Sequence, residues 1–203
     1  MYDFRNFTPT RRTITKSVST HSAHKNDLKI DFKDRCGYCN TIDTWRTTWY
    51  EVDHFVPQKY LSNISNTEYS NLVYSCRSCN NAKRANWPTE SETIYNDGEK
   101  GFIDPCLEEY GTLFFRNDDG SINIRVSQNF NIANWIYTTL KFHKPIHAIN
   151  WNIEKTSDEI DKIKKLIQDK GGIEKVLTEN RDIVVRIYNL FDKYYEYTKL
   201  LTA

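Results

Sequence analysis

The chain has 203 residues, of which 38% are hydrophobic and 27% charged, and its formal net charge is +1. This length suits one elaborated domain or two small ones, and 13 Tyr, 10 Phe and 5 Trp can build a packed core, which excludes a wholly disordered or collagen-like chain. No apolar run approaches ~18 residues and the N-terminus lacks an apolar signal region, so the sequence predicts a cytoplasmic protein without a membrane span.

Charge is distributed unevenly along the chain. Residues 1–90 carry 13 Lys and Arg against 9 Asp and Glu, whereas residues 91–203 carry 15 against 18. Any contact with nucleic acid is therefore expected in the first part. The weak overall charge also predicts low affinity for nucleic acid without the help of a partner.

Three segments are predicted in chain order: a polar N-terminal arm (1–25), a compact core (26–90) and a mixed extension (91–203) that packs on the core or on a partner. Within the core, the patterns predict a helix up to about residue 35, a β-rich hairpin at 44–55, a polar loop at 58–70, a strand at 71–74 and a helix at 80–85.

The extension contains signals for one hairpin and two helices. Asn117-Asp118-Asp119-Gly120 lies between two apolar runs and predicts a tight hairpin turn. A capping box at 156–159 predicts a helix that ends at Gly171-Gly172, and an apolar stripe predicts a last helix over 181–201. Pro145 separates His143 from His147 and would break a helix that aligned them, so this pair is expected to be non-catalytic.

Four of the five cysteines form two CxxC pairs, Cys36–Cys39 and Cys76–Cys79. Two such turns can place four thiolates around one Zn²⁺, whereas the alternatives are a redox pair or unrelated core cysteines. Because both pairs lie beside polar and turn residues, we expect a structural zinc site that pins the ends of the intervening segment. Cys106 lies outside this pattern and is expected to be a packed thiol.

Between the two cysteine pairs lies a second group of polar residues. Asp53 and His54 end the β-rich segment, and Asn71 and Asn80 follow. The stretches EVDHFVP (51–57) and NLVYSCRSCNNAK (71–83) resemble the HNH endonuclease family, in the variant whose motif sits between two zinc-binding turns. The resemblance covers about residues 36–84.

This resemblance implies an α+β fold with a ββα-metal active site, in which a hairpin and a helix hold one divalent cation against a phosphodiester. It implies that His54 is the general base, that Asp53 and Asn80 bind the cation, and that Asn71 braces the loop and orients the His54 ring. Neutral imidazole can accept a proton from water near neutral pH. Oxygen donors suit Mg²⁺ or Mn²⁺ better than a second zinc.

The chain departs from the commonest HNH pattern at two positions. Position 80 is Asn rather than His, and position 84, where some HNH proteins have another histidine, is Arg84. One helical turn separates the two, so Arg84 could contact the same phosphate, as could Lys83; the alternative is that both are ordinary solvated residues. Glu51 shares a strand face with Asp53 and is either a further acidic group or a solvated residue.

Together these features predict a metal-dependent HNH endonuclease that acts on DNA, most simply double-stranded. The stretches GFIDPCLEEY and RNDDGSI resemble the C-terminal part of HNH proteins from prokaryotic anti-phage defence systems of the Septu and retron types, which implies an ATPase partner. Two alternatives stay open: a catalytically inactive zinc-stabilised adaptor for DNA or protein, and an HNH toxin that cleaves RNA.

Overall fold

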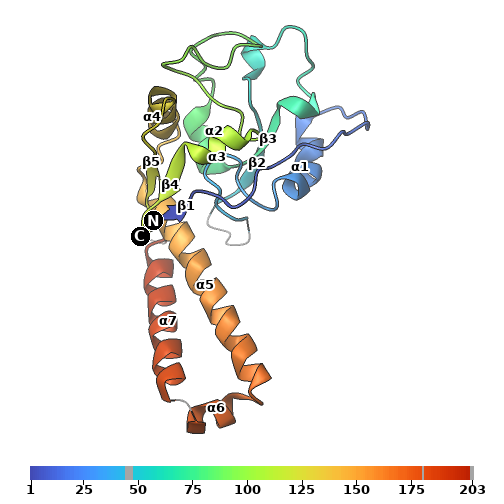
Figure 1. The fold of residues 1–203 in the computed structure, drawn as a ribbon. Helices are drawn as coiled ribbons and strands as arrows, with labels where there is room; N and C mark the ends of the chain where they lie inside the picture. Colours follow the sequence, from blue (N-terminus) through green and yellow to red (C-terminus); the bar gives the residue numbers. More distant parts are fainter. Residues whose placement is uncertain (44–47, 180, 202–203) are drawn as a thin grey trace. The chain divides into compact units, whose positions relative to one another are not determined.

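The computed structural model of the protein describes residues 1–43, 48–179 and 181–201. It divides into two compact units, residues 1–147 and 148–203 (Figure 1). Residues 91–147 therefore belong to the same unit as the two cysteine pairs. Helix α5 (Pro145–Asp169) begins at the end of the first unit and continues into the second.

The centre of the first unit is a two-stranded antiparallel sheet. Strand β2 (Tyr50–His54) pairs with β3 (Leu72–Cys76), so that Tyr50 lies opposite Cys76 and His54 opposite Leu72. The β-rich segment at 44–55 was expected to form a local hairpin, but its described residues supply a single strand whose partner comes later in the chain; residues 44–47 lie outside the described residues.

Short helices surround this sheet. Helix α1 (Lys25–Asp31) packs on both strands, and α2 (Arg77–Lys83) follows β3 without a loop. The connection from β2 to β3 contains two turns of 3₁₀ helix, η2 (Gln58–Tyr60) and η3 (Tyr69–Asn71). The sheet thus carries α2 at the end of β3, as a ββα unit requires.

A second, three-stranded sheet has the order β1-β4-β5 and consists of β1 (Tyr2–Asp3), β4 (Phe114–Arg116) and β5 (Ile122–Ile124). The predicted turn joins β4 to β5, and Gly120 supplies a φ of +82° there, which confirms the hairpin. In the sequence, helix α3 (Glu108–Thr112) precedes β4, and helix α4 (Phe130–Thr139) follows β5.

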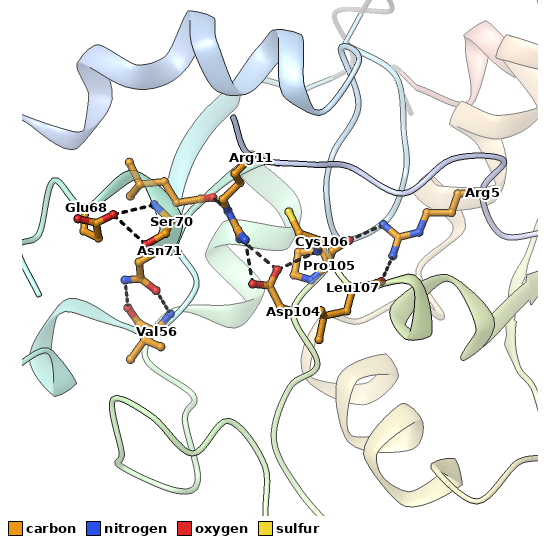
Figure 2. Close-up of polar contacts among 11 residues, drawn as sticks. Arg5, Arg11, Val56, Glu68, Ser70, Asn71, Asp104, Pro105, Cys106 and Leu107 are labelled. Carbon is orange, nitrogen blue, oxygen red and sulfur yellow. Dashed lines mark hydrogen bonds and ion pairs between the residues drawn. The ribbon is translucent and has the colours of Figure 1, made fainter. Parts of the chain in front are cut away.

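The N-terminal segment packs along the first unit. Strand β1 pairs with β4, and Phe4 is buried among aromatic rings that include Phe114 and Phe142. Further along, Arg11 makes a two-pronged ion pair with Asp104 and donates to the carbonyl of Leu72 at 2.6 Å (Figure 2). A 3₁₀ turn, η1 (His21–His24), then leads into α1 and lies against β2.

The second unit consists of the continuation of α5 together with α6 (Ile173–Glu179) and α7 (Arg181–Lys199). Apolar side chains of all three helices face one another, including Ile163, Ile173 and Leu190. Helix α7 matches the predicted last helix to within two residues.

Helix α5 starts eleven residues before the predicted capping box. Proline is tolerated at the first position of a helix, and Pro145 occupies that position rather than breaking a helix. Thr156 is consequently not an N-cap; its hydroxyl donates to the carbonyl of Asn152, four residues earlier. The predicted end is confirmed, because Gly171 and Gly172 both have a positive φ and follow the last turn.

Candidate active site

The four cysteines converge at one end of the β2–β3 sheet. Cys36 and Cys39 come from the turn after α1, Cys76 ends β3, and Cys79 lies in the first turn of α2. Their sulfur atoms all lie within 4.8 Å of one another, and all four residues are buried. We call this group the zinc corner.

The geometry of the zinc corner fits a tetrahedral zinc ion. The Sγ atoms of Cys39 and Cys76 are 3.8 Å apart, close to the ~3.8 Å edge of a tetrahedron with Zn–S bonds of about 2.3 Å. Gly37 makes room for the first turn, because a Cβ there would lie 2.6 Å from the Phe32 ring and 2.8 Å from Val73. A glycine is needed at this position for space.

The end of strand β2 opens onto a surface pocket of about 340 Å³. Its lining residues come from the strand end, from the segment that follows it and from the end of α2: Asp53, His54, Pro57, Gln58, Lys59, Arg84 and Ala85. Successive strand residues point to opposite faces, but the strand ends at His54 and the chain turns at Pro57. Both side chains can therefore face the same pocket.

The His54 ring is held by a main-chain carbonyl. Its Nε2 lies 2.6 Å from the oxygen of Asn66, in the loop between η2 and η3. A carbonyl can only accept a hydrogen bond, so Nε2 carries the proton and Nδ1 carries the lone pair in the neutral ring. A second imidazole, that of His21 in η1, packs edge-on against His54 with 4.5 Å between ring centroids.

Asn71 fastens the chain just beyond His54. Its side-chain oxygen accepts from the backbone N–H of Val56 at 2.8 Å, and its amide nitrogen donates to the Val56 carbonyl at 3.0 Å (Figure 2). Both side-chain groups of this buried Asn are satisfied by one residue. Asn71 thus braces the exit from β2, whereas the His54 ring donates its hydrogen bond to the Asn66 carbonyl.

Asp53 is held by two buried neighbours on one oxygen. The Tyr38 hydroxyl donates to Asp53 Oδ2 at 2.5 Å, and Lys83 Nζ lies 3.0 Å from the same atom. Lys83 Nζ also donates to the carbonyl of His54 at 2.7 Å. Burial, followed by the nearby Asp53 charge, raises the pKa of Tyr38 and keeps its hydroxyl protonated as a donor.

The burial of Lys83 excludes one of the predicted phosphate contacts. Its side chain is fully buried and its ammonium is already shared between Asp53 and His54. The alternative that Lys83 reaches a phosphate is therefore wrong. It stabilises the Asp53–His54 pair from inside instead.

Asn80 contacts Glu51, which lies two residues before Asp53 in strand β2. Its amide nitrogen donates to Glu51 Oε2 at 2.7 Å, and Arg77 Nε lies 3.1 Å from the other oxygen of Glu51. Because the amide nitrogen is used in this way, the amide oxygen is the group that Asn80 could offer to a cation. Asn80 does not line the pocket that Asp53, His54 and Arg84 share.

Arg84 occupies the C-terminal cap of α2. Its φ of +46° lies in the left-handed region that favours glycine. Its backbone N–H donates to the Asn80 carbonyl, and its Nε donates to the carbonyl of Asn81, which leaves the exposed side chain at the rim of the pocket. Strained backbone conformations cluster at functional sites. Here the strained residue is Arg84, whose positively charged side chain lines the pocket.

Comparison with known proteins agrees with this geometry. Residues 36–86 match the family model described as "HNH endonuclease". This segment is an HNH endonuclease domain. The match begins at the first zinc-corner cysteine and ends two residues beyond Arg84, so it includes every residue that the sequence predicted for the site.

The chain is also similar to a curated protein named "Septu protein PtuB" from Bacillus mycoides (strain KBAB4). The two are 34% identical over 122 residues, which cover 50% of this chain and 41% of that relative. The chain thus aligns with less than half the length of the relative. No solved structure matches it.

Several residues that contact the pocket residues were not predicted from the sequence. His21 lies in the N-terminal segment, outside the matched residues, and the Asn66 contact is made by the main chain, which no side-chain pattern reveals. Tyr38 could have been suspected, because it lies between two cysteines and so must be near the sheet.

The remaining candidates lie away from the pocket. His147 is buried against the Phe142 ring, and its carbonyl accepts from Arg116. Cys106 is not part of the zinc corner, and burial raises the pKa of its thiol to about 12. Of the described helices, none is both long and apolar enough to cross a membrane.

Proposed function

We propose that the protein is a metal-dependent endonuclease that hydrolyses DNA phosphodiester bonds with its HNH domain. The observation that carries the proposal is the end of β2, where Asp53 and His54 open together with Arg84 onto one pocket. These are an acidic group, a base and a cation, which are the groups that hydrolysis of a phosphodiester requires.

His54 acts as the general base. Its Nδ1 takes a proton from the water that attacks phosphorus, while Nε2–H stays bonded to the Asn66 carbonyl and orients the ring. Asn71 holds the backbone immediately beyond the ring through Val56. Arg84 pairs with the phosphate and stabilises its charge, and Lys59 supplies a second cation at the same pocket.

Asp53 and Asn80 are the groups that would hold a divalent cation, Mg²⁺ or Mn²⁺. In the described structure, the contacts of Asp53 with Tyr38 and Lys83 both fall on Oδ2, and neither of these two contacts uses Oδ1. Oxygen donors of this kind fit a hard cation. When bound, the cation neutralises charge on the phosphate and polarises the leaving oxygen. The zinc corner has no part in this chemistry and holds the scaffold together.

The proposal also includes a protein partner with which this chain acts. The similarity to a Septu protein supports a role in anti-phage defence with a partner protein. We propose that this partner is an ATPase. The net charge of +1 supports the same view, because a chain with so little excess charge binds nucleic acid weakly at physiological salt. We therefore expect low cleavage by the isolated chain and a marked increase in the complex.

The test compares the wild-type chain with His54→Ala on plasmid DNA in Mg²⁺, with structured RNA digested in parallel. His143→Ala is the matched control, because His143 is exposed and lies outside the pocket. We expect His54→Ala to lose about 10²- to 10⁴-fold in rate and His143→Ala to cleave normally. Unchanged cleavage by His54→Ala would exclude His54 as the base, faster digestion of RNA would favour the toxin alternative, and binding without cleavage would favour the adaptor.

A further inference from the structure

Glu92 lies beyond the HNH domain, yet its carboxylate binds the loop whose Asn66 carbonyl holds the His54 ring. Oε1 accepts hydrogen bonds from the backbone N–H groups of three consecutive residues, Ser62 at 3.2 Å, Asn63 at 3.1 Å and Ile64 at 2.9 Å. Oε2 accepts from the Ser62 hydroxyl at 2.9 Å and the Asn63 amide at 2.7 Å. A single side chain thus fixes three residues of main chain.

These contacts favour the ionised carboxylate. The hydrogen bond from Ile64 N–H is the largest cause, and with those from Asn63 and Ser62 it lowers the pKa of Glu92 to about 2. Successive backbone N–H groups that converge on one anion form a concave site that suits a carboxylate. Glu92 therefore stays ionised, and keeps these hydrogen bonds, throughout the pH range in which enzymes work.

The clamped residues lead directly to the carbonyl that orients His54. After Ile64 the chain enters a turn closed by the Glu68 N–H and the Ser65 carbonyl, 3.0 Å apart. Asn66 lies within this turn, and its carbonyl oxygen is the atom 2.6 Å from His54 Nε2. Only Ser65 separates the last clamped residue from Asn66.

The segment that carries Glu92 is itself anchored in the core. The buried indole of Trp87 donates to the Ser91 carbonyl at 2.8 Å, and its ring stacks on Phe102 and meets Phe55 edge-on. Phe55 directly follows His54. The segment that carries Glu92 thus packs against Phe55, next to His54. The loop that Glu92 binds is exposed.

We propose that Glu92 is a positioning residue for the active site: by clamping residues 62–64 it fixes the Asn66 carbonyl and, through it, the orientation and tautomer of the His54 ring. The inference rests on the proposed role of His54 as general base. Glu92 itself does not line the pocket. A contribution of this kind changes the rate more than it changes binding, since it acts on the geometry of the reacting group.

The experiment uses the full chain, with Glu92→Ala and Glu92→Gln as variants. Glu108→Ala serves as the matched control, because Glu108 is an exposed acid in α3 that lies apart from the loop. Three quantities are measured: amide hydrogen exchange at residues 62–64, the ¹⁵N signals of the His54 ring, and kcat and KM on DNA in Mg²⁺.

We expect the amides of residues 62–64 to exchange at least about tenfold faster in Glu92→Ala. The His54 ring should change from the single Nε2–H tautomer to a mixture, and kcat should fall about tenfold with little change in KM. Glu92→Gln should fall between Glu92→Ala and wild type, and Glu108→Ala should match wild type in all three measurements.

Two results would overturn the inference: amides that keep their protection in Glu92→Ala, or amides that lose it while the ring signals and kcat stay at wild-type values. If the wild-type chain cleaves no nucleic acid, the proposed function fails separately. The exchange and ring measurements then decide the role of Glu92 without any activity.

Discussion

The zinc corner and the catalytic pocket lie at opposite ends of the same two strands, but different parts of the chain hold them in place. The zinc corner depends on few residues: its four cysteines come from two short CxxC segments, and all four are buried. The pocket relies on the Asn66 main chain and on two residues outside the HNH domain, His21 and Glu92. A motif can therefore specify a metal scaffold completely and an active site only in part.

The sharpest way to break this comparison is to remove the zinc corner. Cys76→Ser should abolish zinc binding and unfold the core around β2 and β3, because structural zinc supplies about 10 kcal/mol or more of apparent folding free energy in small zinc domains. Elemental analysis and circular dichroism measure both effects. Cys106→Ser, which changes a cysteine outside the corner, should keep one zinc per chain; loss of zinc in that variant would contradict the assignment.

A smaller loss is expected from the buried support of the pocket. Lys83→Met leaves Asp53 without its buried counter-charge and should cost about 3–5 kcal/mol of the free energy of unfolding. Urea denaturation gives the value. Lys59→Met removes an exposed lysine from the same pocket and should change stability by less than about 0.5 kcal/mol. Equal effects of the two substitutions would show that Lys83 is not the buried support described above.

At the rim of the pocket, stability and activity should move in opposite directions. Arg84→Gly relieves a backbone with φ of +46° and should raise the free energy of unfolding by about 0.5–1 kcal/mol. The same change removes a phosphate contact and should lower cleavage at least about tenfold. Thermal unfolding and a plasmid assay measure the pair of effects.

Arg84→Ala separates the two causes. It removes the same guanidinium but keeps a side chain at the strained position, so it should lose activity without gaining stability. A stability gain of equal size in both variants would mean that the backbone conformation is not the source of the gain.

The smallest effect concerns the cysteine that belongs to neither region. Burial raises the pKa of Cys106 to about 12, above the ordinary value of 9.0. The reactive thiolate is therefore scarce at pH 8 and becomes abundant only as the pH rises towards 12. Iodoacetamide at pH 8, followed by mass spectrometry, should leave Cys106 of the folded protein largely unmodified, while the unfolded chain reacts at all five cysteines. Rapid labelling of the folded protein would contradict this prediction.

Sequence reasoning succeeded where chemistry is tied to spacing. The spacing of two CxxC turns predicted a four-sulfur cluster without knowledge of the segment between them, and the structure confirms it. Asp118-Asp119-Gly120 likewise predicted a tight turn, in which Gly120 has a positive φ. It failed where long-range pairing decides. Strand β2 takes β3 as its partner across a loop, and Pro145 starts a helix that runs through the predicted capping box at Thr156.

The candidate site follows the same division. The strand end at His54 could be predicted, and the structure brings His54 and Arg84 to one pocket. Arg84 was expected on the helix one turn after Asn80, but α2 ends at Lys83 and Arg84 lies at its C-terminal cap. The buried role of Lys83 could not, since a lysine four residues beyond a cysteine pair suggests an exposed helix face. Only the fold shows that this face of α2 lies against Asp53.

A histidine anchored by a main-chain carbonyl has an evolutionary consequence. Every amino acid has a main-chain carbonyl, so most substitutions at position 66 should be nearly neutral and the residue type there can vary among relatives. Inserting or deleting one residue between positions 64 and 66 would move the oxygen away from the imidazole. Selection at this segment should therefore act on its length, and a library of indels would reveal a constraint that a library of point mutations misses.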